Sequence, residues 1–130
     1  MPKKKKILIL GVTGQDGSFL AKFLIKKNLK VHGMVRKSAT GNLNNLKDIL
    51  KNRNLTIHHG DLLDLISVQN LIKNLKPDEI YNFADQDHVR WSFEIPSYSF
   101  DVTGSSVIKI IEIIKNYSPQ SKFFQPLSSN

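Results

Sequence analysis

Residues 6–18 read KILILGVTGQDGS, an apolar run that passes into three glycines spaced three residues apart. The run predicts a buried strand, and the helical spacing that starts near Asp16 predicts that this strand turns directly into a helix. Residues without a Cβ atom suit such a turn. Gly11 permits the turn itself, Gly14 lets a pyrophosphate approach the backbone, and Gly17 lets the helix pack closely on the strand.

The start of that helix offers unpaired N–H groups and the positive end of the helix dipole to a phosphate. A glycine-rich turn without a ligand is the alternative interpretation. We predict a dinucleotide-binding loop made of Gly11, Val12, Thr13, Gly14, Gln15, Asp16 and Gly17.

The same alternation of apolar runs and helical-period segments continues along the whole chain. The predicted strands are Lys6–Val12, Lys30–Arg36, Leu55–Gly60, Glu79–Ala84 and Lys122–Leu127. The predicted helices are Asp16–Lys27, a short helix carrying Leu43, Leu46, Ile49 and Leu50, a helix near Ile66–Leu75 that ends before Pro77, and Phe100–Tyr117. Strands separated by helices need crossover connections, so the sequence predicts a doubly wound parallel α/β sheet of the Rossmann type, cut off after about five strands.

Two of these helices carry a distinctive apolar pattern. In the first, Phe19, Leu20, Phe23 and Leu24 share one apolar face. The last contains Val107, Ile108, Ile110, Ile111, Ile113 and Ile114, which is too much apolar surface for a single stripe. The second face could be covered by a further C-terminal element, by a partner subunit or by a thick core. We expect a homo-oligomer formed through the helix Phe100–Tyr117.

Length and composition bound the class of protein. With 130 residues and 40% hydrophobic content, residues 1–130 are predicted to form a single domain. The chain has no cysteine, which excludes disulfides and thiolate metal ligands. No apolar stretch approaches the roughly 20 residues of a membrane span. The first apolar run leads to Gly11 rather than to a signal-peptide cleavage site, so we expect a cytoplasmic protein without a membrane partner.

The net charge of +8 would suit a nucleic-acid-binding protein. However, the lysines are spread over every predicted helix, and no helix carries a concentrated basic face. We therefore expect no nucleic-acid partner. A cationic surface also suits a multiply anionic nucleotide.

The end of the second predicted strand indicates which dinucleotide is bound. NAD sites usually place an acidic residue there to accept from the ribose 2′-OH, whereas this chain has Arg36, Lys37 and Ser38. No acid occurs between Asp16 and Asp48. A 2′-phosphate would find cationic and hydrogen-bonding partners, so the sequence favours NADP.

Asp61 and Leu62 follow the third predicted strand, at the edge where open α/β sheets bind ligands. We predict that Asp61 accepts from the adenine amino group while Leu62 covers the ring. The alternative is that Asp61 caps the next helix.

These segments together resemble the GDP-mannose 4,6-dehydratase family, which belongs to the extended short-chain dehydrogenases/reductases. The segments that carry the resemblance are Gly11–Ser18, Val31–Arg36, Gly60–Leu62, Pro77–Asn82 and Gln86–Val89. The resemblance spans nearly the whole chain, and other NAD(P)-dependent sugar-nucleotide epimerases or dehydratases are the nearest alternatives.

The resemblance implies that the chain is the N-terminal, NADP-binding part of an enzyme acting on GDP-mannose. In that family NADP takes a hydride from C4, water is eliminated across C5 and C6, and the hydride returns to C6. Ser128 aligns with the family's catalytic Thr or Ser, whose hydroxyl hydrogen-bonds the substrate oxygen. The family's further cofactor contacts fall on Phe83, Ala84, Asp85, Gln86, Asp87 and Tyr98.

Several positions depart from the family pattern. Asp85 and Asp87 place two extra carboxylates near a polyanionic cofactor, which should weaken binding unless cations compensate. Asn130 stands where the family has the glutamate that deprotonates C5, and an amide cannot take that proton. Pro126 removes a backbone donor from the fifth predicted strand. No tyrosine has a lysine four residues later, so the family's Tyr-x-x-x-Lys pair is absent and we expect this chain alone to be inactive.

Two further interpretations concern metals and the class of function. His58 and His59 do not predict a metal site, because adjacent strand residues face opposite sides and no carboxylate cluster completes a ligand set. The alternative to an enzyme fragment is a catalytically inactive NADP-binding module that pairs with a homologue. The departures at Asp85, Asp87 and Asn130 favour that alternative.

Overall fold

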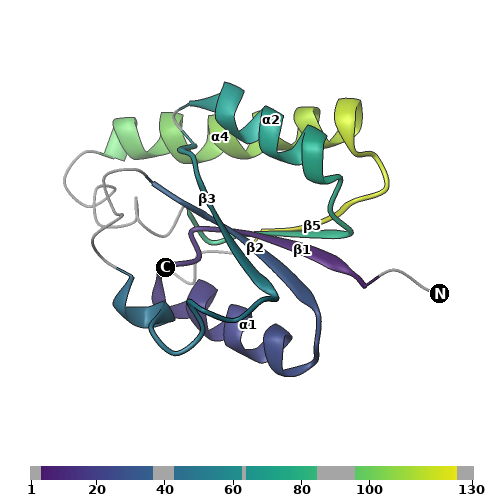
Figure 1. Cartoon of the computed structure of the whole chain (residues 1–130). Coiled ribbons are helices and arrows are strands. Elements are labelled where there is room, and N and C mark those ends of the chain that lie inside the picture. Colours follow the sequence, from purple (N-terminus) through teal and green to yellow (C-terminus); the bar gives the residue numbers. More distant parts are fainter. Residues whose placement is uncertain (1–3, 37–42, 63, 85–95, 126–130) are drawn as a thin grey trace.

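A five-stranded sheet separates two helical layers in the computed structural model (Figure 1), which describes residues 4–36, 43–62, 64–84 and 96–125, with 96–106 as backbone only. The elements are β1 (Lys6–Leu10), α1 (Gln15–Lys26), β2 (Lys30–Val35), η2 (Asn44–Leu46), β3 (Leu55–His59), α2 (Leu65–Leu75), β4 (Glu79–Asn82), α4 (Pro96–Tyr117) and β5 (Lys122–Phe124). None of the helices in these ranges is both long and apolar enough to cross a membrane.

All neighbouring strands pair in parallel, in the order β3-β2-β1-β4-β5. The predicted doubly wound parallel sheet is therefore confirmed. The chain runs outward from β1 to β3 and then crosses back to β4, so β1 has β2 on one side and β4 on the other. In sheets of this kind the order reverses at that point, and a ligand-binding crevice forms at the carboxyl ends of the two central strands.

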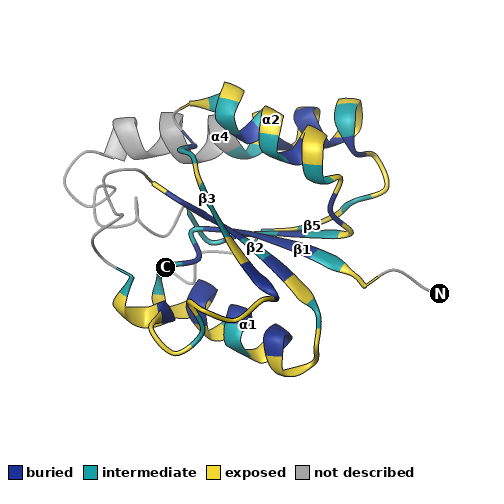
Figure 2. Ribbon diagram, in the orientation of Figure 1, coloured by how far each residue is buried: buried dark blue, intermediate teal, exposed yellow. Residues whose placement is uncertain are grey.

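The core lies on both faces of the sheet, and β1 contributes to both. On one face α1 and η2 cover Ile7 and Ile9, and on the other α2 and α4 cover Leu8 and Leu10 (Figures 1 and 2). These four side chains of β1 are at most 1% exposed. A strand buried on both faces reads as a continuous apolar run, as residues 7–10 do.

The face of α1 that packs on the sheet differs from the predicted one. Phe19 and Phe23 are 74% and 50% exposed, whereas the buried residues of the helix are Gly17, Ser18, Ala21, Leu24 and Ile25. At about 100° per residue, Phe19 and Phe23 lie nearly opposite Ala21. The prediction that the two phenylalanines share a face with Leu24 is wrong, because the helix turns its smallest residues toward the strand at its start.

The ends of several elements also differ from the predictions. Each strand ends earlier than predicted, and the segment after β2 forms a single 3₁₀ turn, η2, followed by turns. Helix α4 begins at Pro96 rather than at Phe100. A proline suits the first position of a helix, because its fixed φ is helical and its missing N–H would be unpaired there in any case.

The isoleucines of α4 divide into two faces. Ile110, Ile113 and Ile114 are buried against α2 and the sheet, whereas Ile108 is 61% exposed and Ile111 is 41% exposed. The expected second apolar face is therefore present in the described part of α4, and what covers it stays a prediction.

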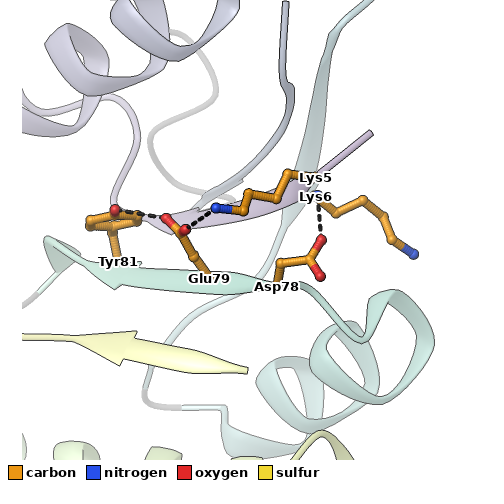
Figure 3. Close-up of polar contacts among 5 residues, drawn as sticks. All are labelled: Lys5, Lys6, Asp78, Glu79 and Tyr81. Atoms are coloured by element: carbon orange, nitrogen blue, oxygen red, sulfur yellow. Dashed lines mark hydrogen bonds and ion pairs between the residues drawn. The ribbon is translucent and has the colours of Figure 1, made fainter. Parts of the chain in front are cut away.

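Polar contacts at the amino end of the sheet hold β1 beside β4 (Figure 3). The Lys6 N–H donates to Asp78 Oδ2 at 2.8 Å, and Lys5 Nζ lies 3.0 Å from Glu79 Oε2. The Tyr81 hydroxyl donates to Glu79 Oε1 at 2.9 Å. Burial and this hydrogen bond raise the pKa of Tyr81 to about 12. Burial alone would raise the pKa of Glu79, but hydrogen bonds from Lys5 and Tyr81 lower it. The contacts of Lys5 and Lys6 join the start of β1 to the start of β4, whereas the bond between Tyr81 and Glu79 lies within β4.

Candidate dinucleotide site

The turn between β1 and α1 packs directly against the end of β4. Gly11 has φ +79°, and a Cβ atom there would lie 2.6 Å from the backbone nitrogen of Ala84. The Gly11 N–H donates to Met34 O at 3.2 Å, which ties the turn to β2 as well. Glycine is therefore required at Gly11 by both conformation and space. The predicted site residues Phe83 and Ala84 are thereby brought beside the loop.

Gly14 and Gly17 lack side chains for different reasons. A Cβ atom on Gly17 would lie 2.5 Å from Gly11 O, so close packing of α1 on the end of β1 excludes any side chain there. A Cβ atom on Gly14 would lie 3.6 Å from Gly11 O, an ordinary contact, and φ at Gly14 is −70°. Nothing in the described fold demands glycine at Gly14. Among the described residues, a Cβ atom there would contact only Gly11 O, so the described fold leaves room for a side chain at Gly14.

The first turn of α1 presents N–H groups that have no acceptor in the described part of the chain. Gly14 is the N-cap and makes no side-chain cap, and the first N–H bonded to it is that of Ser18, at 2.9 Å from Gly14 O. For the N–H groups of residues 15–17, no acceptor occurs in the described part of the chain. Gln15 and Asp16 are exposed, whereas Val12 is fully buried and can offer a ligand only its backbone. Unpaired N–H groups at a helix N-terminus attract anions.

A side chain that the sequence did not indicate contacts this loop. Asn45, in η2, donates from Nδ2 to Thr13 O at 2.8 Å. No motif points to it, because the contact joins residues 32 positions apart and the residues around Asn45 carry no recognisable spacing.

The ends of β2 and β3 lie side by side at the same edge. The Gly60 N–H donates to Val35 O at 3.0 Å, so exposed Arg36 and half-buried Asp61 each follow one of two paired strands. The N-cap of α2 is Asp64, so Asp61 does not take the capping position considered above. Leu62 is 3% exposed within the core cluster under α2, which gives its side chain a core role. Contacts of Asp61 and Leu62 with an adenine ring stay predictions.

Asn82, at the end of β4, is a second polar residue that sequence reasoning missed. It is fully buried, donates from Nδ2 to Gln125 Oε1 at 2.7 Å, and accepts from the Ala84 N–H at 3.2 Å. A buried side chain with both polar ends paired fixes the chain after β4 relative to the residue after β5. The available signal was an amide at an inward-facing position at a strand end.

Several predicted site residues lie outside the described structure. This holds for Lys37, Ser38, Asp85, Gln86, Asp87, Ser128 and Asn130, for Pro126, and for the side chain of Tyr98. Their roles stay predictions.

His58 lies beside another histidine. His32 Nδ1 and His58 Nε2, on neighbouring strands, are 2.9 Å apart. Burial, and then the nearby His58, lower the pKa of His32 to about 4, and burial also lowers the pKa of His58. Because the pKa values of both rings are lowered, the pair is neutral at neutral pH, and one ring then donates to the other. No cluster of three or more potential metal ligands occurs among the described residues.

Known proteins are similar to this chain in both sequence and fold. The family model described as GDP-mannose 4,6 dehydratase matches residues 8–130. The GDP-mannose 4,6-dehydratase of Vibrio cholerae is 39% identical over 133 residues, covering 97% of this chain, and the human GDP-mannose 4,6 dehydratase is 38% identical over 130 residues, covering 94%. The chain spans 36% and 35% of the length of these two relatives.

Solved structures give the same fold. The Bordetella bronchiseptica enzyme WbmH, determined in complex with NAD+, superposes with a TM-score of 0.71 at 29% identity, covering 93% of this chain and 38% of that one. The sheet order, the glycine turn and the sequence match over residues 8–130 agree with one another. This chain belongs to the GDP-mannose 4,6-dehydratase family.

Proposed function

We propose that this chain forms the NADP-binding part of an enzyme that dehydrates GDP-mannose. The observation that carries the proposal is the loop Gly11–Gly17. It combines N–H groups at the start of α1 that have no acceptor among the described residues with room for a side chain at Gly14, at the carboxyl ends of the paired strands β1 and β4. That combination fits a pyrophosphate, which needs donors and close backbone approach together.

The choice of NADP over NAD rests on the end of β2. Arg36 is exposed there, and no acidic residue occurs between Asp16 and Asp48 to accept from a 2′-hydroxyl or repel a 2′-phosphate. WbmH was determined with NAD+, so the choice rests on Arg36, with Lys37 and Ser38 as its predicted partners. When bound, the cofactor supplies hydride chemistry, and this chain's own residues bind and orient it.

The test of cofactor choice is to measure the binding of NADP and NAD to the wild type and to Arg36→Ala by titration calorimetry. A charge-assisted hydrogen bond contributes about 1.5–3 kcal/mol. We therefore expect about tenfold or greater weakening for NADP and less than about threefold for NAD. Arg53→Ala is the matched control, because Arg53 is an exposed arginine in the turn before β3, at the opposite end of the sheet. Equal losses for NADP and NAD would contradict a 2′-phosphate contact.

A second candidate function is an NADP-binding module without turnover. Asn130 at the family's glutamate position, together with Asp85 and Asp87, favours it. NADP binding by the chain without consumption of GDP-mannose would support the module. Release of the dehydrated sugar nucleotide would exclude it.

We also propose that the exposed isoleucine face of α4 mediates self-association. Ile108 and Ile111 are large apolar side chains on a face that the described residues leave uncovered, and such faces mark contact surfaces. The cytoplasm remains the compartment that we propose.

A further inference from the structure

We propose that Asn45 is a positioning residue for the phosphate loop, and that it sets how tightly the loop holds a pyrophosphate. This role rests on the proposed dinucleotide binding. The observation is the hydrogen bond from Asn45 Nδ2 to Thr13 O, 2.8 Å long. Thr13 lies in the middle of the loop, between Gly11 and Gly14.

The bond fixes one peptide unit of the loop at both ends. The carbonyl of Thr13 accepts from Asn45, and the N–H of the same peptide, on Gly14, donates to Gly11 O at 3.3 Å. An anion-binding loop must direct N–H groups toward the ligand and carbonyl oxygens away from it. With its carbonyl held by Asn45, the Thr13–Gly14 peptide cannot rotate to turn that oxygen toward the phosphates without breaking the bond.

Asn45 lies in a segment that is anchored in the hydrophobic core. Its neighbour Leu46 is fully buried in the core cluster under α1, together with the partly buried Leu43 and Ile49. Lys22 of α1 lies 3.7 Å from Asp48, which adds a second link between this segment and the helix. The segment 43–50 is therefore anchored to the same helix whose N-terminus faces the phosphates.

The placement of Asn45 joins two parts of the proposed site. The connection from β2 to β3 begins at Arg36, the proposed partner of the 2′-phosphate, and returns at Asn45 to the pyrophosphate loop. One stretch of chain thus holds residues for both anionic groups of the cofactor. A change at Asn45 should act on the pyrophosphate end alone.

The chain offers a matched control in the adjacent residue. Asn44 is exposed like Asn45, and its side chain makes no hydrogen bond to any described residue. Asn45→Asp removes the N–H donor, keeps the shape of the side chain and adds a negative charge. Asn44→Asp adds the same charge at the neighbouring position. Both variants add one negative charge, so their difference reports what is specific to position 45: the lost donor and the repulsion between the new carboxylate and Thr13 O.

The experiment measures binding of NADP and of 2′-AMP, which lacks the pyrophosphate, to the wild type and both variants. The expected result is NADP binding about threefold to tenfold weaker for Asn45→Asp than for Asn44→Asp, as one hydrogen bond allows. The ratio between the two variants should stay near one for 2′-AMP. Amide hydrogen exchange at residues 12–17 of the ligand-free protein should be faster in Asn45→Asp, with equal melting temperatures for the two variants. A merely structural role would lower the melting temperature and weaken both ligands alike.

Two outcomes overturn the role and separate it from the proposed function. If the wild type binds NADP and the two variants agree within twofold, Asn45 does not position the loop, and dinucleotide binding stands. If the wild type binds no dinucleotide at all, the proposed function fails and the role of Asn45 fails with it.

Discussion

Glycines at the β1–α1 turn are required for unlike reasons, and single substitutions separate them. Gly11 and Gly17 are demanded by the fold, since a Cβ atom at either position would meet backbone atoms at 2.5–2.6 Å. Gly14 is not, since its nearest neighbour would be 3.6 Å away. A glycine that the ligand-free fold does not require indicates a position where a ligand is expected to approach the protein backbone closely.

We expect Gly17→Ala to destabilise the protein by about 1–3 kcal/mol, because a methyl group must force α1 away from Gly11 O. Gly14→Ala should leave the melting temperature within about a degree and weaken NADP binding at least about tenfold, since the methyl group occupies the approach of the pyrophosphate. Thermal unfolding and calorimetric titration of both variants make the comparison. If Gly14→Ala binds NADP as tightly as the wild type, the loop is not the phosphate site.

The roles of site residues could be predicted from the sequence only where they depend on residues close together in the chain. The glycine roles follow from a strand-to-helix junction within seven residues, and the cationic end of β2 is likewise contiguous in sequence. Asn45 and Asn82 could not be found in this way, because their bonds span 32 and 43 positions and depend on how separate elements meet. Ser128 and Asn130 were identified by resemblance alone.

Among the elements, the sheet was easier to predict than the faces of its helices. A continuous apolar run such as residues 7–10 suits a strand that is buried on both faces of a sheet, which favoured a central position for β1. In α1 the apolar pattern favoured Phe19 and Phe23, but close packing at Gly17 set the rotation of the helix and left both exposed. Tertiary packing at one residue thus outweighed the pattern of the whole helix.

The neighbouring strands β2 and β3 are also linked by the histidine pair His32 and His58, whose protonation depends on pH. The pKa of His32 lies near 4 in the folded protein, below about 6.5 for an unfolded histidine, so the unfolded chain binds more protons between these values. The stabilisation is complete above about pH 6.5 and is lost as the pH falls toward about 4. We expect the free energy of unfolding to fall by about 1 kcal/mol over this pH range because of the pair. This figure is smaller than the full pKa difference would give, because the pair is only half-buried.

Urea unfolding at a series of pH values from about 7 to about 4.5 measures that loss. His32→Gln should flatten the dependence, since glutamine does not titrate. His59→Gln, which changes the exposed histidine next to His58, should keep most of it. Equal slopes for the wild type and His32→Gln would exclude the pair as the source.

At the scale of the whole molecule, the fold leaves one helical face of α4 uncovered by the described residues. We expect Ile108→Lys to raise the dissociation constant of self-association at least about tenfold, because a charge would enter an apolar contact. Sedimentation velocity over a range of concentrations measures it, with Ile66→Lys as the control on α2, where the side chain is 71% exposed. A wild type that sediments as a monomer at high concentration would remove the basis for this contact.

The close approach of Gly11 to Ala84 also leads us to expect an order of events during folding. β1 leaves the ribosome first, yet its partner β4 begins only at Glu79, after α1, β2, β3 and α2 have been made. Closing so long a loop is slow compared with forming a helix or a neighbouring strand pair. A nascent chain that has emerged from the ribosome only as far as β3 already contains all three glycines of the turn. It still lacks Ala84, against which Gly11 packs. The proposed dinucleotide site is therefore expected to be complete only after β4 has docked, although its glycine motif comes first in the sequence.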